Sequence, residues 1–327
     1  MLCRVLALQT LLPLASLAAD GGDPVRQQGE DRWVPSLAIT SGLTVQKQRG
    51  SVESALFEDG SPTPVALQPA DDGDDVVVSP FVGGSLELMT PALPIPMRPR
   101  FFLAGEILPT FASDRSLAVR GDPDCVSGPE AGATCAKDET GTRRVPFGEG
   151  AANGQGSKTS AQIDTLVFGA NLGVAFPFQV AGRQLRIKPS VGWINYEVAA
   201  EGLVVDAACA PTNRCTNVAR PGGLPPLIGF LRETTLTGNA SQFFNGIGPG
   251  VGLEMDGGRY GPIGVSLFLG GSAYRILGDR TMTFDATQSY NDQLGMDVAT
   301  AAFKVKIDPW MYRGNVGIRF QWLGSAE

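Results

Sequence analysis

The sequence predicts an all-β protein, a single up-and-down antiparallel transmembrane β-barrel, with eight strands as the count the pattern supports best. Three observations predict it. Apolar residues alternate with polar or small residues in many separate segments, which is the period of a β-strand. The connections between these segments alternate between long and short along the 327 residues. One face of the segments is built mainly of Gly, Ser and Ala, and glycine is abundant at 42 residues.

The chain begins with a segment typical of a secretory signal peptide, residues 1–19. It has one basic residue, Arg4, an apolar run up to Leu17, and small residues at Ala18 and Ala19, where cleavage is expected. A short membrane anchor is the alternative, although the run is short for a span. Residues 20–32 are polar and predict a disordered mature N-terminus. The barrel is expected to occupy residues 33–324.

The first three strands are expected at residues 33–46, 76–88 and 100–111. In the first, Leu37 and Ile39 lie on one face, while Ala38 and Thr40 lie on the other. A polar loop over residues 48–74 should separate the first two strands. The connection to the third strand, TPALPIPMRP, is short and rich in proline.

The middle strands are expected at residues 162–178, 185–198, 243–255 and 263–277. Tight turns are predicted at QVAGRQ and DGGRYG, after the fourth and the sixth strand. Long loops should follow the third, fifth and seventh strands. Within the second of these loops, residues 224–236 could form a short helix or an extra strand segment.

The last strand, residues 310–323, has the clearest alternation. Its apolar face carries Tyr312, Val316, Ile318, Phe320 and Trp322, and its polar face carries Arg313, Asn315, Gly317, Arg319 and Gln321. Residues 302–307 are expected to extend this strand beyond the membrane, with Pro309 marking a bend or bulge.

The alternation of loop lengths favours a membrane barrel. Short periplasmic turns and long extracellular loops are the arrangement of such barrels, whereas a soluble sandwich has no reason to sort loops in this way. Two alternatives stay open. One is a soluble all-β protein, and the other is a barrel of ten or more strands that uses 224–236 and 298–307 separately.

The face rich in small residues should point into the barrel, because the interior of an eight-stranded barrel is only wide enough for side chains to fill it. A charge in such an interior needs a partner. We therefore expect an internal salt-bridge network that includes Glu106 with Arg313 or Arg319. The predicted lumen charges are Glu87, Glu106, Glu254, Arg186, Lys188, Arg313 and Arg319. For Glu87 and Glu254, close to turns, solvation at the mouth is the alternative.

Aromatic residues fall at two levels, as in the girdles of a membrane barrel. The expected short-turn girdle consists of Trp33, Phe101, Phe176, Phe178 and Trp322. The expected long-loop girdle consists of Phe111, Trp193, Tyr196, Phe243, Tyr274, Trp310 and Tyr312.

Four cysteines remain after signal cleavage, which suits an oxidising compartment. Their short separations favour disulfides between Cys125 and Cys135 and between Cys209 and Cys215, although three connectivities are open. A metal site is disfavoured, since the sequence has no histidine. The acidic run at residues 71–75 could bind calcium, but we expect a solvated loop. No cofactor is expected.

The mature chain resembles small outer-membrane β-barrels of the OmpA/OmpX/OmpW-like kind from Gram-negative bacteria. The final strand is similar to the signal read by the barrel-assembly machinery, with Asn315, Gly317, Phe320 and Trp322 at its positions. The chain departs from that pattern by continuing with LGSAE. The resemblance implies a bacterial outer-membrane location and contact with outer-membrane lipids and lipopolysaccharide. It also implies contact with the assembly machinery during biogenesis.

The sequence argues against catalysis and against nucleic-acid binding. The enzymes of similar small barrels use a histidine as general base, and this chain has none. The formal net charge of −7 is unlike the basic face that nucleic acid requires. The expected role is structural or surface-interacting, through long disulfide-tied extracellular loops around a closed interior. A narrow pore, or an OmpW-like channel for ions, small solutes or apolar compounds, is the alternative.

Overall fold

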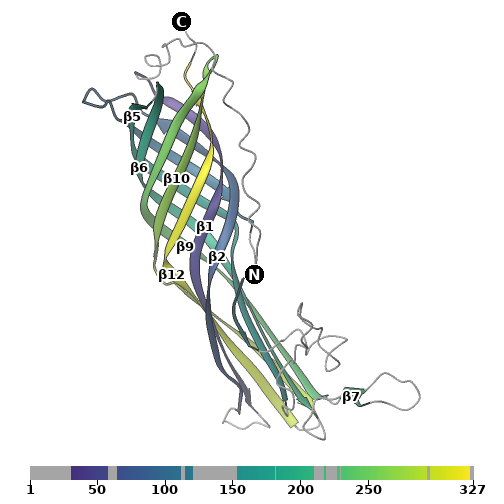
Figure 1. The fold of residues 1–327 in the computed structure, drawn as a ribbon. Helices are drawn as coiled ribbons and strands as arrows, with labels where there is room; N and C mark the ends of the chain where they lie inside the picture. The colour runs from purple at the N-terminus through teal and green to yellow at the C-terminus, as the bar shows by residue number, and fades with distance from the viewer. Residues whose placement is uncertain are drawn as a thin grey trace.

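The computed structural model describes residues 31–57, 65–111, 115–120, 153–180, 182–209, 217–218, 227–228, 230–292 and 295–324. These residues form long β-strands and their connections (Figure 1). No helix among them is long and apolar enough to span a membrane. The predicted signal peptide lies outside the described residues, as do Cys125, Cys135 and Cys215.

Six of the strands, β1, β2, β5, β6, β9 and β12, are far longer than the ~9–11 residues that a membrane crossing requires. Their bounds are β1 Val34–Phe57, β2 Val65–Met89, β3 Arg100–Pro109, β4 Arg115–Arg120, β5 Asn153–Val180, β6 Arg183–Cys209, β7 Asn217–Val218, β8 Leu227–Ile228, β9 Phe230–Tyr260, β10 Ile263–Leu277, β11 Thr281–Asp292 and β12 Gly295–Trp322.

Eight of these strands close into an antiparallel ring, in the order β1-β2-β3-β5-β6-β9-β10-β12 and back to β1. The ring closes where Ser36 pairs with Gln321 and Val45 pairs with Tyr312. The prediction of an eight-stranded barrel is therefore confirmed. The alternative with ten or more ring strands is wrong, because residues 298–307 belong to β12, and the described part of 224–236 lies in β8 and β9.

The tight turns predicted at one end of the barrel are confirmed. Gly182 and Gly261, with φ of 79° and 60°, occupy the β5–β6 and β9–β10 turns. This left-handed conformation costs glycine little and other residues more. The predicted bulge is also present, because the β1–β12 register shifts between Gln46 and Gln48, opposite the segment that contains Pro309.

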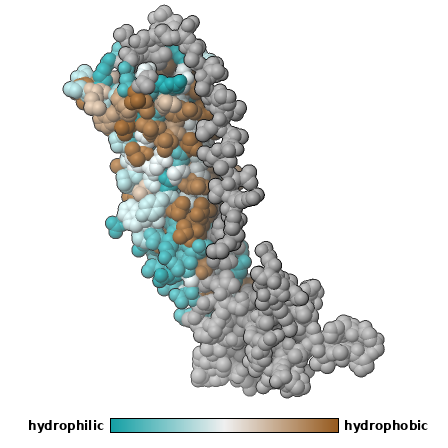
Figure 2. All heavy atoms as spheres, in the orientation of Figure 1, coloured by the Kyte–Doolittle hydropathy of each residue, from teal (hydrophilic) through white to brown (hydrophobic). Residues whose placement is uncertain are grey.

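A band of apolar side chains faces outward from the ring strands. Leu86, Leu103 and Leu172 expose 67%, 59% and 60% of their surface. Soluble proteins rarely expose a large contiguous apolar surface, so the soluble all-β alternative does not fit. Figure 2 shows apolar residues gathered on the upper part of the barrel and hydrophilic residues below them.

Exposed aromatic residues lie at both edges of this band. The assignment of Tyr196 and Tyr274 to the long-loop girdle is wrong. Trp33 and Trp322 are exposed near one edge, and Phe243 and Trp310 near the other. Tyr196 and Tyr274 are fully buried inside the barrel. Their even positions give them the parity of the inward residues of β6 and β10, so the alternation itself directs them inward.

Beyond the apolar band, the strands continue and the polarity of their two faces inverts. In β12, Arg313 and Arg319 point inward while Val316 faces outward; earlier in the same strand, Phe303 is buried inside and Lys304 is exposed. The band therefore has a polar interior and an apolar exterior. The remainder, here called the extension, has an apolar interior and a polar exterior.

The extension consists of two four-stranded sheets packed face to face. One contains β2, β1, β12 and β11, and the other contains β4, β5, β6 and β9; in the described pairings, β11 pairs only with β12 and β4 only with β5. The sheets approach closely, since a Cβ added to Gly202 would lie 2.3 Å from the Phe303 ring. Phe303 stacks on Phe284 with ring centroids 5.1 Å apart.

The prediction of long loops is wrong over much of its range. The predicted loop at 48–74 is mostly β1 and β2, and residues 281–292 form β11 (Figure 1). The apolar residues of these segments face inward, which is the reverse of the pattern that identified the membrane strands. The acidic run at 71–75 belongs to β2, and Asp74 forms an ion pair with Lys47.

Candidate functional site: the charged interior of the barrel

All seven predicted lumen charges lie inside the ring, where the pairing of the strands brings them together. Glu87 comes from β2, Glu106 from β3, Arg186 and Lys188 from β6, Glu254 from β9, and Arg313 and Arg319 from β12. Arg186 is the direct cross-strand partner of Glu254. The prediction of buried salt bridges inside the barrel is confirmed.

Six charges form one group near the short-turn end, here called the six-charge cluster. Its members are Glu87, Arg186, Lys188, Glu254, Asp256 and Arg319. The cluster has three basic and three acidic side chains, so its formal charges cancel. Only Asp256, whose side chain is 21% exposed, is more than slightly accessible, so the alternative that Glu87 and Glu254 are solvated at a mouth is wrong.

Glu254 is the centre of this cluster. Its carboxylate contacts Arg186, lies 3.2 Å from Lys188 Nζ and lies 3.3 Å from Arg319 Nη1. It also accepts hydrogen bonds from Ser266 Oγ at 3.1 Å and Gln321 Nε2 at 2.5 Å. A carboxylate that accepts several charged and neutral donors is compensated for its burial.

Glu87 and Asp256 complete the cluster on either side. Lys188 Nζ lies 2.5 Å from Glu87 Oε1, and Arg319 contacts the same carboxylate. Arg186 Nη2 lies 2.6 Å from Asp256 Oδ1. Asp256 was not among the predicted charges, because the sixth strand was expected to end at Met255. Asp256 lies two residues from Glu254 in the same strand, so the alternation of side chains would have placed it on the inward face.

Glu106 and Arg313 form a separate buried pair further along the barrel. Arg313 Nη1 lies 2.5 Å from Glu106 Oε1, and Arg313 Nη2 donates a 2.8 Å hydrogen bond to Tyr274 Oη. Gly169 provides the space for this pair, since a Cβ there would lie 2.2 Å from Glu106 Oε1. The sequence predicted that Glu106 and either Arg313 or Arg319 belong to the internal network, and the structure shows that Arg313 is the partner of Glu106.

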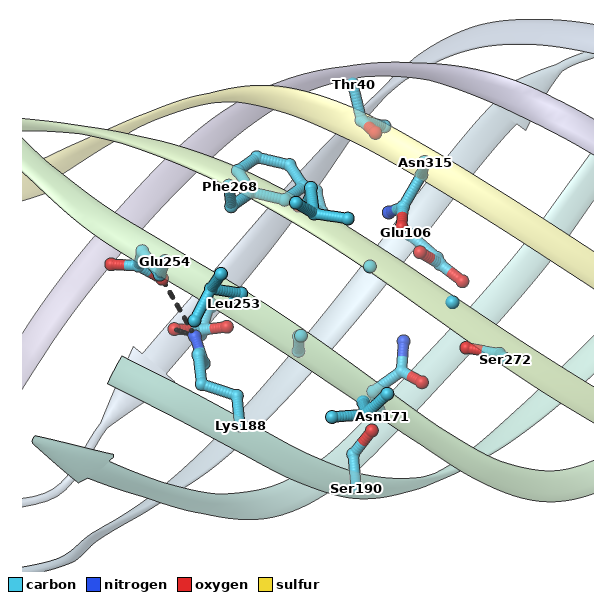
Figure 3. A pocket seen from close by; sticks show the side chains of 18 of the residues that line it. Thr40, Glu106, Asn171, Lys188, Ser190, Leu253, Glu254, Phe268, Ser272 and Asn315 are labelled. Atoms are coloured by element: carbon cyan, nitrogen blue, oxygen red, sulfur yellow. Dashed lines mark hydrogen bonds and ion pairs between the residues drawn. The ribbon is translucent and has the colours of Figure 1, made fainter. Parts of the chain in front are cut away.

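A cavity of about 90 Å³ lies between the two groups of charges. Its lining includes Thr40, Asn171, Ser190, Ser272 and Asn315, with Glu254 and Lys188 toward one end and Glu106 toward the other (Figure 3). This volume has room for a few water molecules.

Aromatic rings cover three of the interior cations. Lys188 Nζ lies 4.4 Å from the centroid of Phe102. The guanidinium carbons of Arg313 and Arg319 each lie 5.2 Å from a ring centroid, of Tyr274 and Phe268 respectively. Cation–π contacts of this kind are favourable when the cation is desolvated. They also fill the space around the ion pairs.

Beyond the Glu106–Arg313 pair, on the side away from the six-charge cluster, the interior of the barrel becomes apolar. Gln46 Nε2 donates a 2.7 Å hydrogen bond to Tyr196 Oη, and Tyr196 packs on Phe244 with centroids 5.8 Å apart. The apolar core of the extension follows, with Phe303 among its members. Within the described residues, no group of three or more histidine, cysteine, aspartate or glutamate side chains could hold a metal ion.

The predicted assembly-signal residues all lie in the second half of β12. Phe320 and Trp322 face outward and Asn315 and Gly317 face inward. Cys209 is the last residue of β6, and the predicted disulfides lie outside what the structure describes.

Comparison with known proteins yields structural neighbours alone. No protein-family model matches the chain, and no curated protein matches its sequence. A major outer membrane protein from Thermus thermophilus is 12% identical, covers 84% of this chain and 99% of its own, and has a TM-score of 0.26.

Two further neighbours are also bacterial outer-membrane proteins. Ail, the attachment invasion locus protein of Yersinia pestis, is 10% identical with a TM-score of 0.18, covering 83% of this chain and 97% of its own. The outer membrane protease OmpT from Escherichia coli is 10% identical with a TM-score of 0.23, covering 87% and 96%. These scores are too low to carry an argument about function. The closed ring, the outward apolar band and the interior charges are what make this chain an outer-membrane-type β-barrel with buried salt bridges inside.

Proposed function

We propose that this protein is a closed scaffold in the outer membrane of a Gram-negative bacterium, of the OmpA/OmpX/OmpW-like kind. It is secreted by its N-terminal signal peptide and holds its extension outside the cell for structural or surface contact. It is not an enzyme, in keeping with a sequence that has no histidine. Nucleic acid is not among its partners, in keeping with a formal net charge of −7.

The observation that carries this proposal is the filled interior. From the short-turn end, the interior holds the neutral six-charge cluster, a cavity of about 90 Å³, the Glu106–Arg313 pair and then a continuous apolar core. An ion crossing this interior would have to separate buried ion pairs and then pass through packed apolar side chains. Each step is costly.

The extension supports the surface role. About half of the 28 residues of β12 lie beyond the apolar band, which corresponds to a reach on the order of 45 Å at ~3.4 Å per residue. Its two sheets share a packed apolar core, so the extension holds whatever it carries at a fixed distance from the membrane.

Conductance in planar lipid bilayers tests this proposal. The wild-type protein and the charge-reversed variant Arg313→Glu are compared with Phe303→Ala, which opens space in the apolar core instead. A closed scaffold gives no steady single-channel steps in the wild type or either single variant, because each variant leaves one barrier in place.

The opposite result identifies the alternative function. Regular single-channel steps in the wild type that change with Arg313→Glu would replace the scaffold with a narrow pore for ions or small solutes. Heat-modifiable gel mobility confirms that each variant is folded before its conductance is compared.

A further inference from the structure

One edge of β11 has no partner strand in the described pairings, where β11 pairs with β12 alone. Within the apolar band the ring is closed here, because β10 pairs with both β9 and β12. The pairing with β9 ends at Leu277, whereas β11 continues along β12 into the extension. The edge of β11 that faces away from β12 is called the free edge below.

The hydrogen bonds identify which backbone groups lie on the free edge. Ile307 N–H donates to the Arg280 carbonyl at 2.9 Å, so residue 280 directs its carbonyl toward β12. Successive residues of a strand direct their backbone groups to opposite edges, and the β11–β12 register contains no shift. The N–H and C=O groups of Thr283, Asp285 and Thr287 therefore point to the free edge.

The first N–H group on the free edge is capped. Thr281 N–H donates to Asp279 Oδ1 at 3.0 Å, in agreement with the direction derived for the odd-numbered residues. Among the described residues, no backbone partner pairs with Thr283, Asp285 or Thr287 on this side. A row of free donors and acceptors on a strand edge is a template for pairing with another extended chain.

β11 lacks the features that protect strand edges in natural proteins, which are prolines, charged residues and short strands. Of the other edges left open in the described pairings, β2 carries Pro69 and four aspartates over residues 71–75, and β4 has only six residues. Thr281–Asp292 contains no proline, lysine or arginine. β9 borders the same side, but Gly238 leaves it without an inward side chain beside Phe284, and glycine weakens a strand.

The side chains of β11 determine which strand would fit beside it. Met282, Phe284 and Ala286 face inward as part of the apolar core, so an added strand needs apolar residues at alternate positions. Asp285 faces outward, and its partner on β12 is the uncharged Ala302. A basic residue opposite Asp285 on the added strand would form a favourable cross-strand pair.

A second copy in the same membrane does not fit the free edge. A twofold axis along the membrane normal keeps the general direction of β11 across the membrane and reverses the direction in which its faces point. The joined sheet would place the polar outward side chains of one copy beside the apolar inward side chains of the other, and a sheet with one buried face requires the two faces to match.

We propose that the free edge of β11 binds an extended segment of another protein by strand addition, through main-chain hydrogen bonds to Thr283, Asp285 and Thr287. The segment has alternating apolar and polar residues, with a basic residue opposite Asp285. The proposal rests on the proposed function, because it names the kind of partner that the extension contacts outside the cell. Its failure would leave the conductance result unchanged, so the two proposals are separable.

The probe is a fluorescein-labelled peptide with the sequence of residues 298–307, VATAAFKVKI, a segment that pairs with the opposite edge of β11 in the intact chain. Fluorescence anisotropy measures its binding to the full-length protein in neutral detergent micelles. Two N-methylated forms block the backbone nitrogens of either the odd or the even residues. One form should bind like the unmodified peptide and the other roughly tenfold more weakly or less, because only one edge of the peptide faces β11.

Thr287→Pro and Thr287→Ala are the matched protein variants. Proline at position 287 removes a donor on the free edge and leaves the ladder to β12 intact. Thr287→Pro should therefore lower the affinity for the peptide roughly tenfold or more. Thr287→Ala keeps the backbone N–H and should bind like the wild type. Heat-modifiable gel mobility shows whether both variants are folded.

Equal binding of the two N-methylated peptides to the wild type would overturn the proposal, and this arm depends on no protein variant. Equal peptide affinity of folded Thr287→Pro and the wild type would overturn it as well, and so would an equal loss in Thr287→Ala. Concentration-dependent dimers of the wild type without peptide, absent in Thr287→Pro, would overturn the choice of partner and assign the edge to a second copy.

Discussion

Replacing Glu254 by Gln should be among the most destabilising single changes in the barrel. The substitution keeps the size of the side chain but removes its charge, so Arg186, Lys188 and Arg319 lose a shared partner in a buried site. Removing one partner of a buried ion pair costs about 3–5 kcal/mol. For a denaturant dependence of about 2–3 kcal/mol per molar urea, the unfolding midpoint should fall by about 1–2.5 M.

Tryptophan fluorescence during urea unfolding in lipid vesicles measures this loss. All four tryptophans, Trp33, Trp193, Trp310 and Trp322, face outward with exposed fractions between 39% and 58%, so their emission reports on transfer from lipid to water. An unfolding midpoint for Glu254→Gln within error of the wild type would refute the assignment of Glu254 as the centre of a stabilising network.

Asp74→Asn is the matched control, because it breaks an ion pair on the surface of the same barrel. A hydrogen bond and the charge of Lys47 lower the pKa of Asp74. A lowered folded-state pKa favours the folded state above the unfolded pKa of the group, and this benefit is lost as the pH falls through the folded value. Both side chains are substantially exposed, so solvent screens the pair. The midpoint at neutral pH and the acid-unfolding profile should match the wild type.

Two further substitutions test the packing and the second ion pair by the same unfolding measurement. Gly202→Ala should lower the free energy of unfolding by about 1–3 kcal/mol, because its Cβ would lie 2.3 Å from the Phe303 ring. The control Gly314→Ala, where nothing lies within 4 Å, should lower it much less. Equal losses in the two variants would contradict the close packing of the sheets. Glu106→Gln and Arg313→Gln should each destabilise the barrel. The double variant should lose less than the sum, with a coupling of about 0.5–3 kcal/mol, whereas strict additivity would mean that the pair does not interact.

The membrane half of the barrel could be predicted from sequence because its two faces differ so strongly. In the last strand, every outward position from Tyr312 to Trp322 is apolar or glycine, and the inward positions hold Arg313 and Arg319. The alternation then assigned each charge to the interior without any knowledge of its partner. Which acid meets which base depends on strand register. Lys188 is 66 positions from Glu254 and 101 from Glu87, and register over such separations is not encoded in any local pattern.

The extension could not be predicted from the alternation of outward apolar and inward polar residues, because in the extension the apolar residues face inward and the polar residues face outward. Val52 and Phe303 point inward, and Arg49 and Lys304 point outward, so a search for apolar outward residues misread these segments as loops. Asp256 was missed for a different reason. It lies one residue beyond the expected end of its strand, where a change of a single residue decides whether a charge is assigned to the interior or to a turn.

The exchange of polarity along a single strand also fixes how deeply the barrel sits in a bilayer. Around Pro309 the outward residues change from Lys304 and Lys306 to Trp310 and Tyr312 within a few positions. Inserting the barrel more deeply from the extension side would move the ammonium groups of Lys304 and Lys306 into the hydrocarbon, which costs up to ~2–4 kcal/mol per group at the bilayer midplane. Moving it the other way would lift aromatic rings out of the interface they favour. The residues at the boundary between the two halves of the molecule therefore set the depth of insertion. Variants that shift this boundary along the strand should change the insertion depth without changing the fold.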